Sequence, residues 1–399
     1  MRWSSRAALG LATVLLLATD VARSAELLPL PSADERDRIL AHGPWPIPLA
    51  RDASNRASGN EAAIAFGRRM FHEPRLSANG YVACAACHQT DRGWTDAIPR
   101  ARGLAPVDRN TPTLTNAALY AWFGWSGASD SLWMASLRPI LDEREMGSSA
   151  AAVARVVRIG DGLACEYRLA FGRAPESMDD EVVMVDVAKA IAAFLETLTT
   201  GRTPFDEFRD ALARGDQRKA EGYPAAAARG ARLFVGEADC ASCHSGANFT
   251  DGAFHPADAK EVGRAEGVLS VLASPYSLAS RFNDDPAGTK ARAEATRALK
   301  QQPSLRGQFR VPSLRNVAVT PPYLHDGSRE TLREAVQHTG VKALPGSDVD
   351  DLVAFLLTLT DDAGARRPVQ RPADSTCRES TADAREASSE VLTASRPAR

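Results

Sequence analysis

The sequence predicts a mainly α-helical protein built from two tandem domains of similar design. Three observations support this fold class: the 399-residue length, a set of patterns that occurs in both halves, and the scarcity of strand signals. A chain of this length exceeds what one hydrophobic core usually organises, and 44% of its residues are apolar, which is enough for two cores. We therefore expect two helical domains, one after the other.

The first 25 residues are typical of a cleaved secretory signal peptide. Arg2 and Arg6 precede an apolar run over residues 7–18, and residues 22–24 include small side chains suited to cleavage. A signal anchor is the alternative, but the run is short for a bilayer and no second long apolar segment follows. The sequence predicts export without stable membrane insertion.

The two halves share an opening pattern and a closing pattern. Gly67 to Phe71 is matched by Gly230 to Phe234, and residues 193–199 are matched by 354–360. The closing segments carry apolar residues at helical spacing, which we expect to lie in the cores: Ile191, Phe194, Leu195 and Leu198 in the first, and Leu352, Phe355, Leu356 and Leu359 in the second.

These repeats suggest the domain limits. We expect an N-terminal domain over residues 26–205 and a C-terminal domain over 206–362, with the polar stretch 200–224 connecting them. Residues 363–399 are rich in Arg, Ala, Ser, Thr, Pro and Glu, which predicts a disordered tail. The formal net charge of −2 gives no sign of the basic surface that a nucleic-acid-binding protein would carry.

Each half contains a Cys-x-x-Cys-His motif, Cys84–Cys87–His88 in the first and Cys240–Cys243–His244 in the second. The two thiols of such a motif form thioether bonds to haem vinyl groups, and the adjacent imidazole ligates the iron. A zinc site and a thioredoxin-like redox pair are the competing interpretations. A histidine directly after the second cysteine, twice, in an exported chain favours two covalently bound c-type haems.

The remaining cysteines, Cys165 and Cys377, lie outside these motifs. A disulfide is compatible with an oxidising compartment. The position of Cys377 in the predicted tail argues against one.

The supply of sixth iron ligands differs between the halves. No histidine lies between His88 and His244, so a histidine from its own domain is not expected to cap the first haem, although Met134, Met146, Met178 and Met184 remain available. No methionine follows Met184. The candidates for the second haem are therefore His255, His325, His338, a tyrosine such as Tyr323, another weak ligand, or no ligand.

Residues 60–360 resemble the bacterial di-haem cytochrome c peroxidases, and more closely their MauG-type relatives, which oxidise side chains of a partner protein. Besides the haem motifs, the resemblance rests on residues 109–113 (Arg-Asn-Thr-Pro-Thr), 125–127 (Trp-Ser-Gly), 138–140 (Arg-Pro-Ile), 145–147 (Glu-Met-Gly), 312–317 (Pro-Ser-Leu-Arg-Asn-Val) and 320–327 (Thr-Pro-Pro-Tyr-Leu-His-Asp-Gly).

The resemblance implies roles for individual residues. Trp125 would relay electrons between the haems, Glu145 would transfer protons on the open face of the first haem, and Pro139 would shape the same pocket. Asn110, with the backbone carbonyls of Thr320 and Pro322, would hold a calcium ion.

The chain departs from the family pattern at two positions. The pocket glutamine of the family is Ala135 here, which removes one hydrogen-bonding partner for peroxide. The sixth ligand of the second haem falls at Thr339, a poor iron ligand, whereas the adjacent His338 is chemically a better one. His338 as a ligand and His338 as a structural histidine are equally compatible with the sequence.

Together these patterns predict a periplasmic di-haem enzyme that reacts with hydrogen peroxide at the haem on His88 and oxidises a protein through the haem on His244. MauG-like oxidation of a partner's side chain is the first hypothesis. The alternatives are a peroxidase that takes electrons from a small cytochrome or copper protein, and a non-catalytic electron carrier.

Overall fold

The protein is seen in a computed structural model that describes residues 31–258, 260–338, 344–362 and Cys377. The predicted signal peptide, Thr339 and the predicted tail apart from Cys377 lie outside these residues. In the described part helices dominate, and the two named strands, β1 (Phe254–Pro256) and β2 (Gln308–Arg310), form a single antiparallel pair. The mainly α-helical prediction is confirmed.

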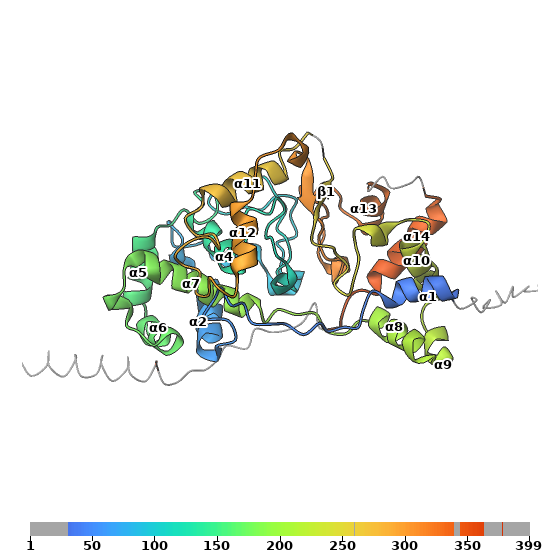
Figure 1. The fold of residues 1–399 in the computed structure, drawn as a ribbon, viewed down its shortest axis with the longest axis horizontal. Helices are drawn as coiled ribbons and strands as arrows, with labels where there is room; N and C mark the ends of the chain where they lie inside the picture. The colour runs from blue at the N-terminus through green and yellow to red at the C-terminus, as the bar shows by residue number, and fades with distance from the viewer. Residues whose placement is uncertain (1–30, 259, 339–343, 363–376, 378–399) are drawn as a thin grey trace, which may run out of the picture.

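The helices form two groups that lie apart in Figure 1. The first contains α2 (Glu61–Phe71), α3 (Cys84–Cys87), α4 (Leu132–Leu141), α5 (Ala150–Ile159), α6 (Leu163–Phe171) and α7 (Asp180–Leu195). The second contains α1 (Ala33–Leu40), α8 (Pro204–Arg214), α9 (Gln217–Glu221), α10 (Ala225–Val235), α13 (Leu332–His338) and α14 (Gly346–Leu357). Each group surrounds its own cluster of buried apolar side chains.

In each half the opening helix crosses the closing helix at a glycine. A Cβ added to Gly67 on α2 would lie 1.9 Å from the carbonyl oxygen of Ala190 on α7. A Cβ added to Gly230 on α10 would lie 1.9 Å from the carbonyl oxygen of Asp351 on α14. The repeated glycine is therefore explained by the close approach of two helix backbones.

The closing helices supply the core faces that the sequence predicts. Ile191, Phe194 and Leu195 are buried in the first cluster, and Leu198 packs against it. All four predicted residues of the second stripe, Leu352, Phe355, Leu356 and Leu359, are buried in the second cluster.

Two segments contact the cluster of the other half of the chain. Ile39 of α1 is buried in the second cluster, whereas Val271 of α11 (Arg264–Ala273) is buried in the first. The segment containing α12 (Lys290–Arg297) is also held by a polar contact, because the buried Lys189 of α7 donates to Asp284 at 2.5 Å. The boundary near residue 205 remains a prediction, and these contacts cross it.

The structure joins Cys165 of α6 and Cys377 in a disulfide. Cys377 is fully buried. The expectation that a cysteine in the tail would remain unpaired is wrong, since sequence position gives no information on where a distant residue packs. None of the described helices has the length and apolarity needed to cross a bilayer.

We predict that Gly67→Ala destabilises the protein, because the new methyl group would overlap the backbone of α7. Overpacking of this kind typically costs about 1–3 kcal/mol. The measurement is the free energy of unfolding. Gly222→Ala is the control, since its Cβ would lie 3.4 Å from the nearest atom, an ordinary contact. Equal stability of the two variants would contradict the proposed crossing.

Candidate functional site

The first Cys-x-x-Cys-His motif lines a cavity of about 200 Å³. Cys84, Cys87 and His88 face it from α3 and the residue that follows. Neither cysteine forms a disulfide, so both thiols are available for covalent attachment. Burial raises the pKa of Cys84 to about 12 and that of Cys87 to about 11, so both side chains are protonated thiols before any group binds.

The imidazole of His88 is oriented by a backbone carbonyl. Its Nδ1 donates to the carbonyl oxygen of Trp94 at 3.0 Å, and burial lowers its pKa, so the ring is neutral. A neutral ring that carries its proton on Nδ1 has its lone pair on Nε2, which suits an iron ligand.

Glu145 and Pro139 lie on the wall of the same cavity. Pro139 is in the last turn of α4, and its carbonyl accepts from Met146 N at 3.1 Å, which turns the chain back after the helix. The carbonyl of Glu145 in turn accepts from Leu104 N at 3.0 Å. These backbone contacts fix the place of the carboxylate.

The electrostatics of Glu145 favour a proton carrier. Burial raises the pKa of its carboxyl group, and Arg138, with Nη2 at 4.0 Å from Oε1, partly opposes the rise. Leu132, Ala135 and Ser136, which also line this cavity from α4, offer little to a polar ligand. Ala135 has no polar side chain, and the Ser136 hydroxyl donates to the carbonyl of Leu132 at 2.9 Å.

The second motif lines a larger cavity, of about 310 Å³. Cys240 and His244 face it, and His244 Nδ1 donates to the carbonyl oxygen of Phe249 at 3.1 Å. Cys243 lies beside it, with Sγ 3.7 Å from Nδ1 of His255. Each half thus presents two free thiols and a neutral histidine at or beside an apolar cavity, a donor set that fits a c-type haem.

The two cavities share part of their walls. Pro112, Thr113, Tyr120 and Arg310 line both. Trp125 lines the second cavity, its Nε1 donates to the carbonyl of Asn110 at 2.8 Å, and its own carbonyl accepts from Arg310 N at 2.8 Å. Trp125, the predicted electron relay, therefore lies next to Arg310, one of the residues that line both cavities.

Arg310 is a residue that the sequence reasoning missed. It is 6% exposed, its Cζ lies 3.7 Å from the ring centroid of Tyr120, and its buried Nη1 has no hydrogen-bond partner among the described residues. Arg310 directly precedes the Val-Pro-Ser-Leu-Arg-Asn motif, and this position is the only sequence feature that could have drawn attention to it. The local pattern does not show that the Arg310 side chain lines both cavities.

The three residues of the predicted calcium site all line the second cavity: Asn110, Thr320 and Pro322. Asn110 is buried and its Nδ2 donates to the carbonyl of Ile98 at 3.0 Å, so its amide is held in a fixed orientation. Among the described residues no group of three or more His, Cys, Asp and Glu side chains is suited to a metal ion. A cation here would depend on neutral oxygen ligands.

His338 is not brought to the second cavity. It is exposed at the end of α13, and its Nδ1 accepts a hydrogen bond from Arg329 Nη2 at 2.7 Å. In the neutral ring the proton is then on Nε2, so that nitrogen has no lone pair to offer to iron. His255, Tyr323 and His325 do line the cavity. His325 stacks on Phe309 at 3.7 Å, and its buried Nε2 has no partner among the described residues.

Of the four candidate methionines, Met146 is the one that lines the first cavity. Met134 and Met184 are buried in the first apolar cluster, and Met178 packs against it.

Comparison with known proteins reveals one family. The model described as di-haem cytochrome c peroxidase matches residues 61–215. The chain is 33% identical to the methylamine utilization protein MauG of Methylorubrum extorquens over 325 residues, which cover 77% of this chain and 81% of the relative. It is 30% identical to the cytochrome c551 peroxidase of Nitrosomonas europaea, over 74% of this chain and 79% of the relative.

Solved structures lead to the same family. The crystal structure of a MauG-like protein associated with microbial copper homeostasis superposes with a TM-score of 0.61 at 27% identity, covering 83% of this chain and 98% of that one. The diheme peroxidase BthA of Burkholderia thailandensis shares the fold, with a TM-score of 0.58 at 24% identity over 78% of this chain and 89% of that one.

We predict that each motif attaches one haem independently. A Cys84→Ser, Cys87→Ser double variant should lose half of the haem per protein, because thioether bonds need the thiols, and the second motif should remain loaded. Intact mass and pyridine haemochrome absorbance measure this. A double variant that retains both covalent haems would contradict the assignment.

Proposed function

This chain belongs to the di-haem cytochrome c peroxidase family, which includes the MauG proteins, and on that premise we propose that it reduces hydrogen peroxide at the haem on His88 and oxidises a protein partner through the haem on His244. Family membership makes it a di-haem oxidoreductase of the peroxidase type. The observation that carries the finer proposal is that Glu145 lines the same cavity as His88, in a half where no histidine follows His88 to cap the iron.

The haem, when bound, supplies the electrons and the iron that peroxide reduction requires. The task of Glu145 is to accept a proton from the peroxide oxygen that approaches the iron and to return it to the oxygen that leaves. A carboxyl group with a raised pKa suits both halves of this transfer, since it holds and releases a proton near neutral pH more readily than an exposed one. The nearby positive charge of Arg138 favours the ionised carboxylate of Glu145, which is the form that can accept a proton.

Trp125 is the residue we assign to electron transfer between the two sites. Its indole borders the second cavity, and its main chain is bonded to Arg310, which borders both. The indole N–H donates to a carbonyl oxygen, which holds the ring in one orientation but does not act as a base.

For the protein partner we favour MauG-like oxidation of a side chain. Two relatives, of 33% and 29% identity, are named MauG, and no histidine follows His88 in its half to block the peroxide site. The second candidate is a peroxidase with electrons from a small cytochrome or copper protein, which the 30% identity to a cytochrome c551 peroxidase supports. Export to the periplasm and a calcium ion on Asn110, Thr320 and Pro322 complete the proposal.

Glu145→Gln should slow peroxide consumption by roughly 10²–10⁴-fold, the usual contribution of a general acid–base group. In the wild-type protein the rate of peroxide consumption should fall as the pH drops through the raised pKa of Glu145, because the protonated carboxyl group cannot accept a proton. The Gln variant should not show this pH dependence. Stopped-flow absorbance measures both. Glu143→Gln, an exposed residue of the same turn, is the control; similar rates in the two variants would remove the assigned role.

The two activities are separated by adding peroxide with candidate partner proteins and analysing the partner by mass spectrometry. Side-chain oxidation predicts a mass increase or cross-link on tryptophan or tyrosine of the partner. Rapid oxidation of a small reduced cytochrome or copper protein, with every partner side chain unmodified, would favour the peroxidase instead.

Calcium removal should perturb the second haem, because Asn110, Thr320 and Pro322 line its cavity. We expect a chelator to alter the absorbance of that haem and Ca²⁺ to restore it better than Mg²⁺, whose octahedral geometry suits carbonyl ligands on fixed backbone poorly. Elemental analysis gives the stoichiometry; a fully active protein without calcium would reject the site.

A further inference from the structure

The loop that follows the second motif, residues 244–249, has its carbonyls bonded by side chains from distant parts of the chain. The carbonyl of Gly246 accepts from His42 Nδ1 at 3.1 Å, and that of Ala247 accepts from Arg315 Nε at 2.7 Å. The carbonyl of Asn248 accepts from the Ser313 hydroxyl at 2.7 Å. The loop ends at Phe249, whose carbonyl binds Nδ1 of His244.

Phe249 is the residue that most needs external support. Its φ of +51° lies in the left-handed region, which a bulky residue adopts only when its surroundings impose it. Its ring is fully buried and lies against Phe205, Phe234 and Phe355, with centroids 5.2, 5.9 and 6.1 Å away. The orientation of its carbonyl therefore depends on how this ring is held.

His42 holds Phe249 from the N-terminal part of the chain. It is 3% exposed and stacks on the Phe249 ring with centroids 4.7 Å apart and an interplanar angle of 12°. Burial lowers the pKa of His42 to about 4, so the ring is neutral and its single N–H is the one that donates to Gly246. One side chain thus fixes both the ring at the end of the loop and the carbonyl at its centre.

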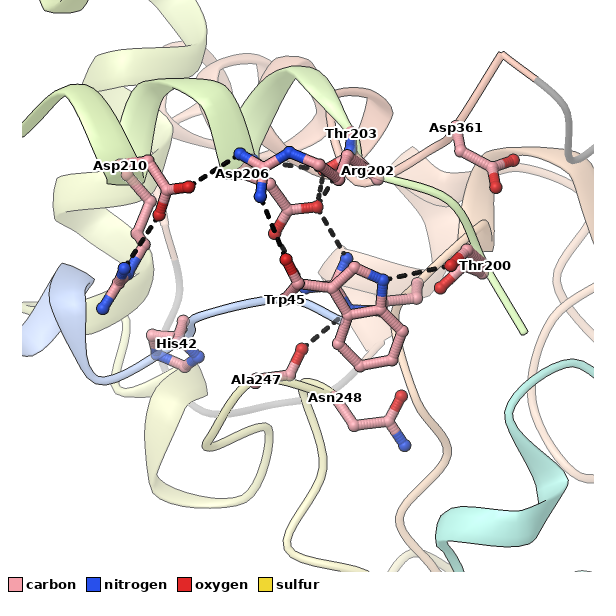
Figure 2. Close-up of polar contacts among 12 residues, drawn as sticks. His42, Trp45, Thr200, Arg202, Thr203, Asp206, Asp210, Ala247, Asn248 and Asp361 are labelled. Carbon is pink, nitrogen blue, oxygen red and sulfur yellow. Dashed lines mark hydrogen bonds and ion pairs between the residues drawn. The ribbon is translucent and has the colours of Figure 1, made fainter. Parts of the chain in front are cut away.

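The segment that carries His42, residues 33–46, which we call the N-terminal brace, is itself anchored. Trp45 stacks on the guanidinium of Arg315 at 3.7 Å and donates through Nε1 to the carbonyl of Thr200 at 3.1 Å. Arg315 is fully buried and ion-paired with Asp206, with Nη2 2.9 Å from Oδ1. Figure 2 shows Trp45 between Asn248 on one side and Asp206 and Arg202 of the linking segment on the other, with His42 on the same N-terminal segment as Trp45.

The first motif has the equivalent histidine bond, and Thr113 Oγ1 donates to the carbonyl of Gly93 at 2.7 Å much as Ser313 does to Asn248. Among the described residues, however, no buried histidine stacks on Trp94 as His42 does on Phe249. His88 donates to Trp94, and that loop is closed by its own ends through a bridge between Gln89 and Thr95. The nearby histidine, His72, is exposed and donates to the carbonyl of Arg68 in its own helix. The histidine that stacks on the last ring of the loop and also bonds a loop carbonyl is therefore found, among the described residues, at the second site.

We propose that the N-terminal brace, through His42, is a positioning element for the second haem: it holds Phe249 so that the carbonyl keeps its hydrogen bond to His244, and it thereby sets the reduction potential of that haem. The proposal rests on the proposed function in one respect, that His244 ligates the second iron. A firm N–H···O=C bond makes the imidazole a stronger donor to iron, which stabilises the ferric state. Loosening the brace should raise the potential.

Three substitutions separate the two contacts of His42. His42→Ala removes both, His42→Phe keeps the stack and loses the N–H, and His42→Gln keeps a donor and loses the stack. His72→Ala is the control. Each is made in the full protein and in the Cys84→Ser, Cys87→Ser background, in which the second haem is expected to be the one that remains. The readouts are spectroelectrochemical titration, electron paramagnetic resonance and haem content.

We expect His42→Ala to raise the ferrous-to-ferric ratio of the second haem about tenfold at a fixed potential, which is about 59 mV for a one-electron couple. His42→Phe and His42→Gln should give smaller shifts, and His72→Ala none. Should His42→Ala fail to fold, the Phe and Gln variants carry the test. Unchanged potentials and spectra in folded His42 variants, or equal shifts of both haems, would overturn the proposal.

A His244→Ala variant distinguishes this failure from that of the proposed function. If it leaves the spectrum of the second haem intact, the assignment of His244 as ligand fails. If it alters the spectrum while the His42 variants do not, only the positioning role of the brace fails.

Discussion

The site geometry depends on one hydrogen bond that occurs once in each half, from Nδ1 of the motif histidine to a carbonyl oxygen. Trp94 accepts it in the first half and Phe249 in the second, at 3.0 and 3.1 Å, and both residues have left-handed φ values, +64° and +51°. The bond fixes the tautomer, so Nε2 faces the cavity with its lone pair.

From this common frame the two sites diverge. Pro139, in the last turn of α4, and Glu145, just after the helix, line the first cavity, and the ends of its proximal loop pair through Gln89 and Thr95. The second receives Trp125 and the three calcium candidates, and its proximal loop is held by His42 and Arg315. Tyr120 and Arg310 belong to both walls, so a change at one cavity has a direct structural route to the other. A duplicated fold thus supports one site suited to proton transfer and one suited to electron transfer.

The sequence predicted what depends on local spacing. The motifs, the repeated glycines and the buried faces of α7 and α14 follow from patterns a few residues long. It did not predict contacts between distant segments: α1 on the second cluster, Val271 on the first, or the disulfide of Cys377. His42 carries no local signal, because its role arises only when α1 packs beside a loop some 200 residues away. The sequence also did not show whether the His338 side chain would face the second cavity or solvent, because this depends on how α13 packs.

We propose that the two haem sites are inequivalent, with the first open to peroxide and the second serving electron transfer. Electron paramagnetic resonance of the resting ferric protein tests this most directly, since it reports the spin state of both irons at once. We expect one high-spin and one low-spin signal, with the high-spin signal lost on addition of peroxide. Two low-spin signals that peroxide leaves unchanged would contradict the account.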